Sequence, residues 1–239
     1  MKVAVISDIH GNLLAFEAVL ADIAEQGVDI TVNLGDLVSG PMQPREALAR
    51  VMALGHPTIR GNHERTLFVD KPDIVDHFAV SQLTGEQIDW IKALPATLVV
   101  GDLFLCHGTP TSDTQPWLDN WWEGRDTTLP GEADVVAHAA GLDHPVLLCG
   151  HTHIPRIVRL RDGRLIVNPG SVGLQIVRGA PDARYAIIER RNGLWQGAIR
   201  SVPYDWAAAA RTAAANGFPQ WQAPLETGWV GPEGLFTRS

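Results

Sequence analysis

Apolar runs and helical periodicities alternate along the first hundred residues. Residues 2–6 are continuously apolar, and apolar side chains then recur at helical spacing from residue 13 to residue 23. A second buried strand is predicted over 29–34, a helix over 45–54 and a third short strand over 57–60. Because strands alternate with helices at this spacing, we expect βαβ units with parallel strand pairing.

The middle of the chain has a different pattern. Two strands are predicted over 98–100 and 103–106, joined by a Gly-Asp turn. The polar segment 109–131 contains Trp117, Trp121 and Trp122, and we interpret it as a substrate-facing excursion from the core. The three tryptophans either pin this segment down or form a lid that stacks on a nucleobase. Further strands are expected over 146–149, 156–160, 165–168, 185–189 and 195–201.

The C-terminal part begins with an alanine-rich helix over 205–216. The remaining segment, 217–239, is rich in Pro, Gly and Trp, so we expect an irregular tail over the surface. No internal repeat or linker is visible, which predicts one domain over 1–216 followed by the tail. The tail tryptophans, Trp221 and Trp229, could cover the body or a partner chain, so a homodimer is compatible with the sequence.

Composition narrows the class of protein. The 239 residues are 45% hydrophobic, which is enough for a sizeable core, and no apolar run reaches the ~18 residues of a membrane span. The net charge of -8 and the scattered Lys and Arg disfavour binding of extended nucleic acid. Two cysteines cannot staple a fold of this size, and the N-terminus lacks a long apolar signal region. We therefore expect a cytoplasmic protein.

Polar motifs follow the predicted strands directly. The carboxyl ends of neighbouring strands in an α/β sheet share one edge, so side chains placed there converge. These motifs are Asp8-Ile9-His10, Gly35-Asp36, Gly61-Asn62-His63-Glu64, His107-Gly108 and Gly150-His151-Thr152-His153.

The side chains of these motifs are typical metal ligands. Carboxylate, imidazole and amide groups are the mixed oxygen and nitrogen donors of Mn, Fe, Co, Ni or Zn. A single ion needs about four ligands. The candidates number more than four, which favours two ions that lie about 3.5–4 Å apart and share a bridging carboxylate. The candidates are Asp8, His10, Asp36, Asn62, His107, His151 and His153.

Charge balance in such a site indicates an anionic substrate. Two divalent ions bring four positive charges, whereas the candidate ligands include only the carboxylates of Asp8 and Asp36. The residual positive field would attract an anion, and a phosphate ester matches it because both ions can stabilise charge on phosphoryl oxygens.

The ordered motifs D-x-H, G-D, G-N-H-E, H and G-H-x-H resemble the calcineurin-like metallophosphoesterase superfamily. The resemblance covers roughly residues 1–190 and is closest to the small bacterial and archaeal phosphodiesterase-like branch. It implies an α/β fold with two packed β-sheets flanked by helices, a four-layer α/β/β/α sandwich.

The resemblance also implies roles for the motif residues. The first ion would be held by Asp8, His10, Asp36 and His153, and the second by Asp36, Asn62, His107 and His151, with Asp36 bridging. A metal-bridging hydroxide would attack in line, and His63 would protonate the leaving oxygen. The two divalent ions could be Mn, Fe, Zn, Ni or Co, of which Mn is favoured.

One departure from the superfamily pattern bears on the substrate. Protein phosphatases follow Gly-Asp with a phosphate-binding arginine, but Gly35-Asp36 is followed here by Leu-Val-Ser-Gly-Pro. We therefore expect a phosphodiester or nucleotide rather than a phosphoprotein. A phosphomonoesterase, a diadenosine polyphosphate hydrolase and a non-catalytic scaffold of the same fold are the alternatives. The missing arginine could be replaced by Arg60, Arg65, Arg125 or Arg178.

Overall fold

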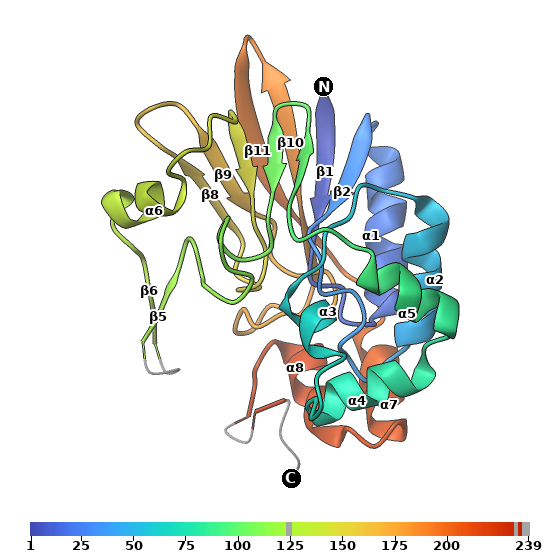
Figure 1. Cartoon of the computed structure of the whole chain (residues 1–239). Coiled ribbons are helices and arrows are strands. Elements are labelled where there is room, and N and C mark those ends of the chain that lie inside the picture. Colours follow the sequence, from blue (N-terminus) through green and yellow to red (C-terminus); the bar gives the residue numbers. More distant parts are fainter. Residues whose placement is uncertain (123–125, 232–233, 236–239) are drawn as a thin grey trace.

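Two stacked β-sheets form the centre of the molecule, with helices on both outer faces (Figure 1). The computed structural model describes residues 1–122, 126–231 and 234–235. None of the helices in these ranges is long and apolar enough to span a membrane.

The first sheet has the strand order β11-β10-β1-β2. Strand β1 (Lys2–Ile6) pairs in parallel with β2 (Ile30–Asn33) and antiparallel with β10 (Ala183–Arg191). Strand β11 (Leu194–Val202) completes one edge through a hairpin with β10. The parallel β1–β2 pair confirms the βαβ unit expected from the sequence.

The second sheet has the order β3-β4-β7-β9-β8. Its three central strands, β4 (Leu103–Leu105), β7 (Val146–Leu148) and β9 (Leu165–Asn168), are parallel. Antiparallel strands close both edges, β3 (Leu98–Val100) next to β4 and β8 (Arg156–Arg159) next to β9. Parallel central strands place several carboxyl ends at the same edge.

Alternating side chains of β1 explain the layers. Val3 and Val5 are buried between the sheets, whereas Ala4 and Ile6 contribute to an outer core with α1 (Leu13–Glu25). Successive side chains of a strand point to opposite faces, so a continuously apolar strand must be covered on both sides. The first sheet is covered by α1, α2 (Pro44–Leu54) and α5 (Gly85–Lys92) (Figure 1).

The outer face of the second sheet is covered by α6 (Glu132–His138) and by part of the 109–131 segment. Trp117 is buried there and donates from Nε1 to the carbonyl of Val135 at 3.0 Å, so this tryptophan has a packing role. The same segment forms a hairpin of β5 (Asn120–Trp122) and β6 (Asp126–Thr128). The side chains of Trp121 and Trp122 lie outside the described part of the structure.

The four layers confirm the predicted fold class, but the third predicted strand is much shorter than expected. Residues 57–60 contribute only a single parallel bridge between Asn33 and Thr58. The chain turns at Gly61 into the short helix α3 (Asn62–Thr66), which ends the pairing.

The C-terminal segment is also more ordered than expected. After α7 (Trp206–Ala215), residues 219–227 form a 3₁₀-helix (Pro219–Trp221) and α8 (Gln222–Thr227). Trp221 is completely buried in a cluster with residues of α7 and α4 (Ile74–Gln82). The prediction of an irregular surface tail is therefore wrong for these residues, which together with α7 we call the C-terminal cap. Apolar contacts of Trp221 stabilise the C-terminal cap, and the Pro- and Gly-rich composition of the segment did not predict this packing.

Candidate metal centre

The five sequence motifs meet at the carboxyl ends of the parallel strands. Asp8 follows β1, Asp36 follows β2, and His107 follows β4. Backbone hydrogen bonds hold the first two loops against each other, because the amides of Asp8 and His10 donate to the carbonyls of Gly35 and Asp36 at 2.9 and 3.0 Å. His151 and His153 follow β7, and Asn62 and His63 begin α3.

Strained backbone marks the ligand positions. Six non-glycine residues in the described part of the chain have a positive φ, and five of them are predicted ligands. L-residues rarely adopt this left-handed conformation, which costs about 1–2 kcal/mol for each residue. Such strain is typical of functional sites, where the fold aims a side chain at a ligand. The five are Asp8 (φ 56°), His10 (48°), Asp36 (56°), His151 (69°) and His153 (58°).

Glycines in the motifs make room for the carboxylates. A Cβ atom on Gly61 would lie 2.1 Å from Oδ1 of Asp36. A Cβ atom on Gly150 would lie 2.1 Å from Oγ of Ser7 and 2.9 Å from Oδ2 of Asp8. These contacts are far too short for any side chain, so both motifs require glycine there.

Four buried side chains form what we call the first half of the centre. Donor atoms of Asp8, His10, Asp36 and His153 all lie within 4.8 Å of one another. Nε2 of His10 lies 3.1 Å from Nε2 of His153, which lies 3.4 Å from Oδ1 of Asp8. Nδ1 of each imidazole meets a backbone carbonyl, of Ser39 at 2.7 Å for His10 and of Leu174 at 2.6 Å for His153. Nδ1–H donation to these carbonyls leaves Nε2 as the ligand atom.

The second half of the centre comprises Asp36, Asn62, His107 and His151. Donor atoms of Asp36, His107 and His151 lie within 4.8 Å of one another. Oδ1 of Asn62 lies 3.0 Å from Nε2 of His107 and 2.9 Å from Nδ1 of His151. Asp36 therefore belongs to both halves, where a bridging ligand would be.

The charge states of Asp8 and His10 suit a divalent cation. Both carboxylate oxygens of Asp8 are buried and have no hydrogen-bond partner among the described residues. Burial opposes ionisation, yet the neighbouring imidazoles of His153 and His107 hold the pKa of Asp8 below its usual value. A buried carboxylate without a partner is costly unless a cation neutralises it. Burial lowers the pKa of His10 to about 4, which keeps this imidazole neutral and able to ligate.

His63 lies beside the first half, with its ring centroid 5.3 Å from that of His10. Nδ1 of His63 lies 3.0 Å from Oδ1 of Asp76, a buried carboxylate on α4 that also accepts from Oγ1 of Thr66 at 2.7 Å. Burial opposes protonation of His63, but the carboxylates of Asp36 and Asp76 outweigh it and raise its pKa to about 9. In the metal-free protein this raised pKa favours the protonated form of His63, which is the form that a proton donor requires.

Two carboxylates near the centre were missed by the sequence analysis. Asp76 is one, since nothing in its local sequence connects it to His63. The other is Glu64, whose buried carboxylate accepts from the amides of Asp36, Leu37 and Gly61 at 2.7–2.8 Å. The position of Glu64 in the G-N-H-E motif could have indicated its importance. Its hydrogen bonds hold α3 against the Asp36 loop.

The arginines proposed to contact phosphate have different surroundings. Arg65 forms a two-pronged ion pair with Asp113 at 2.7 and 2.9 Å. Arg178 lies over the ring of Trp229, 5.6 Å from its centroid. Arg60 lines a pocket that also includes His107, and Arg125 lies outside the described residues.

Comparison with known proteins agrees with this geometry. The family model of the calcineurin-like phosphoesterase superfamily domain matches residues 1–193. The chain belongs to this superfamily. Membership confirms the prediction of a metal-dependent phosphoric ester hydrolase.

Several members are similar over most of their length. The phosphodiesterase YfcE of Escherichia coli is 30% identical over 199 residues, covering 79% of this chain and 88% of YfcE. An uncharacterized protein of Methanocaldococcus jannaschii is 28% identical over 243 residues, covering 92% of this chain and 94% of its own. The crystal structure of a metallophosphoesterase from Sphaerobacter thermophilus has a TM-score of 0.79 at 26% identity, covering 96% of this chain and all of that one. These relatives support the small bacterial and archaeal branch.

Proposed function

We propose that the protein hydrolyses a small phosphodiester or nucleotide at a centre of two divalent ions. The observation that carries the proposal is that two donor sets share Asp36, one of them fully buried and containing Asp8, whose carboxylate oxygens accept no hydrogen bond from the described residues. Similarity to YfcE, a phosphodiesterase, favours the diester over the monoester. We expect Mn²⁺ to support turnover, because the mixed carboxylate, imidazole and amide donors suit it.

The protein's own groups supply the remaining chemistry. Two divalent ions, when bound, lower the pKa of the attacking water and neutralise charge on phosphoryl oxygens. These ions would be held by Asp8, Asp36, Asn62 and the histidines of both halves. His63 donates its proton to the departing alkoxide oxygen. Asp76 orients His63 through the hydrogen bond to Nδ1 and keeps the imidazole charged.

The first test compares two substrates with the same leaving group. Protein stripped of metal and reloaded with Mn²⁺ is assayed with bis(p-nitrophenyl) phosphate and with p-nitrophenyl phosphate. Faster turnover of the diester is the expected result. A preference for the monoester would indicate a phosphatase instead. If two ions bind and neither ester is hydrolysed, the proposed diester hydrolysis is contradicted, and the non-catalytic scaffold is the alternative to test next.

The second test concerns His63. With a nucleotide methyl diester, whose methoxide leaves poorly without a proton, His63→Ala should reduce kcat about 10²–10⁴-fold while the protein keeps both ions. His77→Ala is the matched control, because His77 is exposed on α4 next to Asp76. Unchanged turnover of the methyl diester by His63→Ala would rule out the proton-donor role.

A further inference from the structure

Thr152 occupies the variable position of the G-H-x-H motif, between two candidate ligands of different ions. His151 belongs to the second half of the centre and His153 to the first. Both of these flanking residues have a left-handed backbone, with φ of 69° and 58°. Backbone strained in this way persists only where surrounding contacts hold it, so the contacts of Thr152 bear on the direction of both imidazoles.

The side chain of Thr152 is buried, and its hydroxyl group is fully hydrogen-bonded. The hydroxyl oxygen accepts from Nδ2 of Asn168 at 3.1 Å and from the amide of Ile154 at 3.4 Å. The hydroxyl proton is donated to Oδ2 of Asp119 at 3.3 Å. Asn168 is held in turn, since its Nδ2 also donates to the carbonyl of Gly150 at 2.7 Å. One hydroxyl group therefore connects the histidine loop to β9 and to Asp119.

Asp119 is a fully buried carboxylate whose two oxygens have different partners. Oδ1 accepts from Nε and Nη2 of Arg156 at 3.0 and 2.7 Å, and this ion pair offsets the cost of burying the carboxylate. Arg156 is the first residue of β8, so the carboxylate is attached to a strand of the second sheet. Because the guanidinium fixes Oδ1, Oδ2 is held where the hydroxyl group of Thr152 needs its acceptor.

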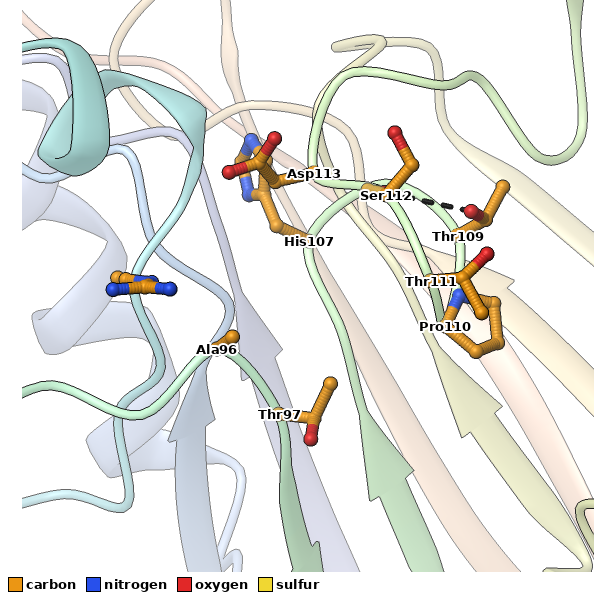
Figure 2. Close-up of a pocket in the computed structure, with 9 residues that line it drawn as sticks. Ala96, Thr97, His107, Thr109, Pro110, Thr111, Ser112 and Asp113 are labelled. Carbon is orange, nitrogen blue, oxygen red and sulfur yellow. Dashed lines mark hydrogen bonds between the residues drawn. The ribbon is translucent and has the colours of Figure 1, made fainter.

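Asp119 lies in the segment 109–131, which leaves the centre directly behind His107 (Figure 2). This segment contacts the histidine loop a second time, since the carbonyl oxygen of Thr114 lies 2.9 Å from Nε2 of His151. The segment expected to face substrate therefore also contacts the loop that carries two candidate metal ligands.

We propose that Asp119 is a positioning residue that, through the hydroxyl group of Thr152, holds His151 and His153 in the directions in which they bind metal. The inference rests on the two-ion centre proposed above, and it does not depend on which phosphate ester is hydrolysed. Both ions are affected, because Thr152 lies between a ligand of the first ion and a ligand of the second.

Binding of Mn²⁺ tests the proposal without requiring turnover. Metal-free protein is titrated with Mn²⁺, and the free ion is quantified from its EPR signal, which gives a Kd for each ion. Thr152→Val keeps the shape of the side chain but removes the hydroxyl group, and it should raise both Kd values about 10- to 100-fold. Thr152→Ser keeps the hydroxyl group, so both Kd values should stay close to those of the unchanged protein.

Asp119→Asn should raise both Kd values by a similar factor, because the hydroxyl group of Thr152 loses its carboxylate acceptor. Combining Asp119→Asn with Thr152→Val should add little to either change, since both substitutions remove the same hydrogen bond. Thermal melting of the metal-free proteins checks that each variant is folded.

Asp22→Asn is the matched control. Asp22 also accepts from two nitrogens of an arginine, Arg200 at 2.6 and 2.7 Å, and from a hydroxyl group, that of Tyr185. These partners lie on β11 and β10, which carry no candidate ligand. Asp22→Asn should therefore lower the melting temperature and leave both Kd values unchanged.

Three results would overturn the proposal. One is a folded Thr152→Val protein whose Kd values equal those of the unchanged protein. Another is a double variant in which the two fold-changes multiply, because Asp119 would then not act through Thr152. The third is an equal rise in Kd for Asp22→Asn, which would make the effect one of general stability. The p-nitrophenyl assays report separately on hydrolysis, so two bound ions without turnover would contradict the proposed function alone.

Discussion

The two halves of the metal centre differ in how they are enclosed. All four side chains of the first half are buried, and its two imidazoles are fixed by the carbonyls of Ser39 and Leu174. In the second half, His151 is partly exposed and its Nε2 meets the carbonyl of Thr114 at 2.9 Å. The second half also borders a pocket of about 290 Å³ whose lining includes His107 and Arg60. We therefore expect the first ion to be retained tightly and the second to exchange and to face substrate.

Different parts of the chain support the two halves. Leu174, whose carbonyl fixes His153, packs its side chain into the same cluster as Trp221 of the C-terminal cap. The second half instead depends on the loop after His107, which the Arg65–Asp113 ion pair attaches to α3. Loss of a cap contact and loss of a loop contact should consequently affect different ions.

The largest effect is expected from Asp36→Asn, which removes the carboxylate common to both halves. Both ions should be lost and turnover should fall to background, because each half loses a charged ligand at once. Metal analysis after equilibrium dialysis measures this, with Asp143→Asn, an exposed carboxylate, as the control. Two ions retained by Asp36→Asn would contradict the bridging role.

A more selective effect is expected from His151→Ala. This variant should keep one ion per chain and lose turnover by roughly 10²–10³-fold, the usual cost of removing one electrostatic stabiliser of the transition state. His10→Ala should remove the first ion instead. The metal-to-protein ratio, followed while Mn²⁺ is diluted, distinguishes the two ions. If His151→Ala lost no more metal on dilution than the unchanged protein does, the assignment of a separate, more weakly held second ion would be contradicted.

The smallest effect on activity is expected from Trp221→Ala, which leaves every ligand in place. Deleting a fully buried indole should lower the free energy of unfolding by about 3–5 kcal/mol. Urea denaturation measures this loss, and Trp229→Ala is the control because that side chain is 55% exposed. Exchange of the first ion should accelerate in Trp221→Ala. If the second ion were loosened instead, the cap would support the other half.

The metal-binding motifs could be predicted because their positions depend on strand order alone. Asp8 and Asp36 each follow an apolar strand, and parallel neighbours bring such residues to one edge regardless of the loops between them. The alternation of strands and helices predicts the βαβ unit and its parallel pairing, whereas the four-layer sandwich was implied by the resemblance to the superfamily. The assignment of individual ligands to the two ions stays a prediction for metal analysis to test.

Residues whose role depends on tertiary packing could not be found in this way. Asp76 reaches His63 only because α4 packs beside α3, and the sequence around it reads as an ordinary helix start. Trp221 is buried because α7 and α4 provide an apolar surface, which the local sequence around Trp221 does not predict. The strand expected over 57–60 fails for a similar reason, since its length depends on where Gly61 turns the chain.

The left-handed backbone at five candidate ligand positions lowers the stability of the metal-free protein but places the side chains that would bind metal. Glycine adopts this conformation without strain, so a chain selected for stability alone would carry glycine at these positions. Asp and His at these positions therefore lower the free energy of unfolding of the metal-free protein. Bound ions should recover the difference, so the melting temperature should rise as metal is added. The protein would then be most vulnerable to unfolding and proteolysis before its ions arrive, which makes metal supply a determinant of how much protein persists.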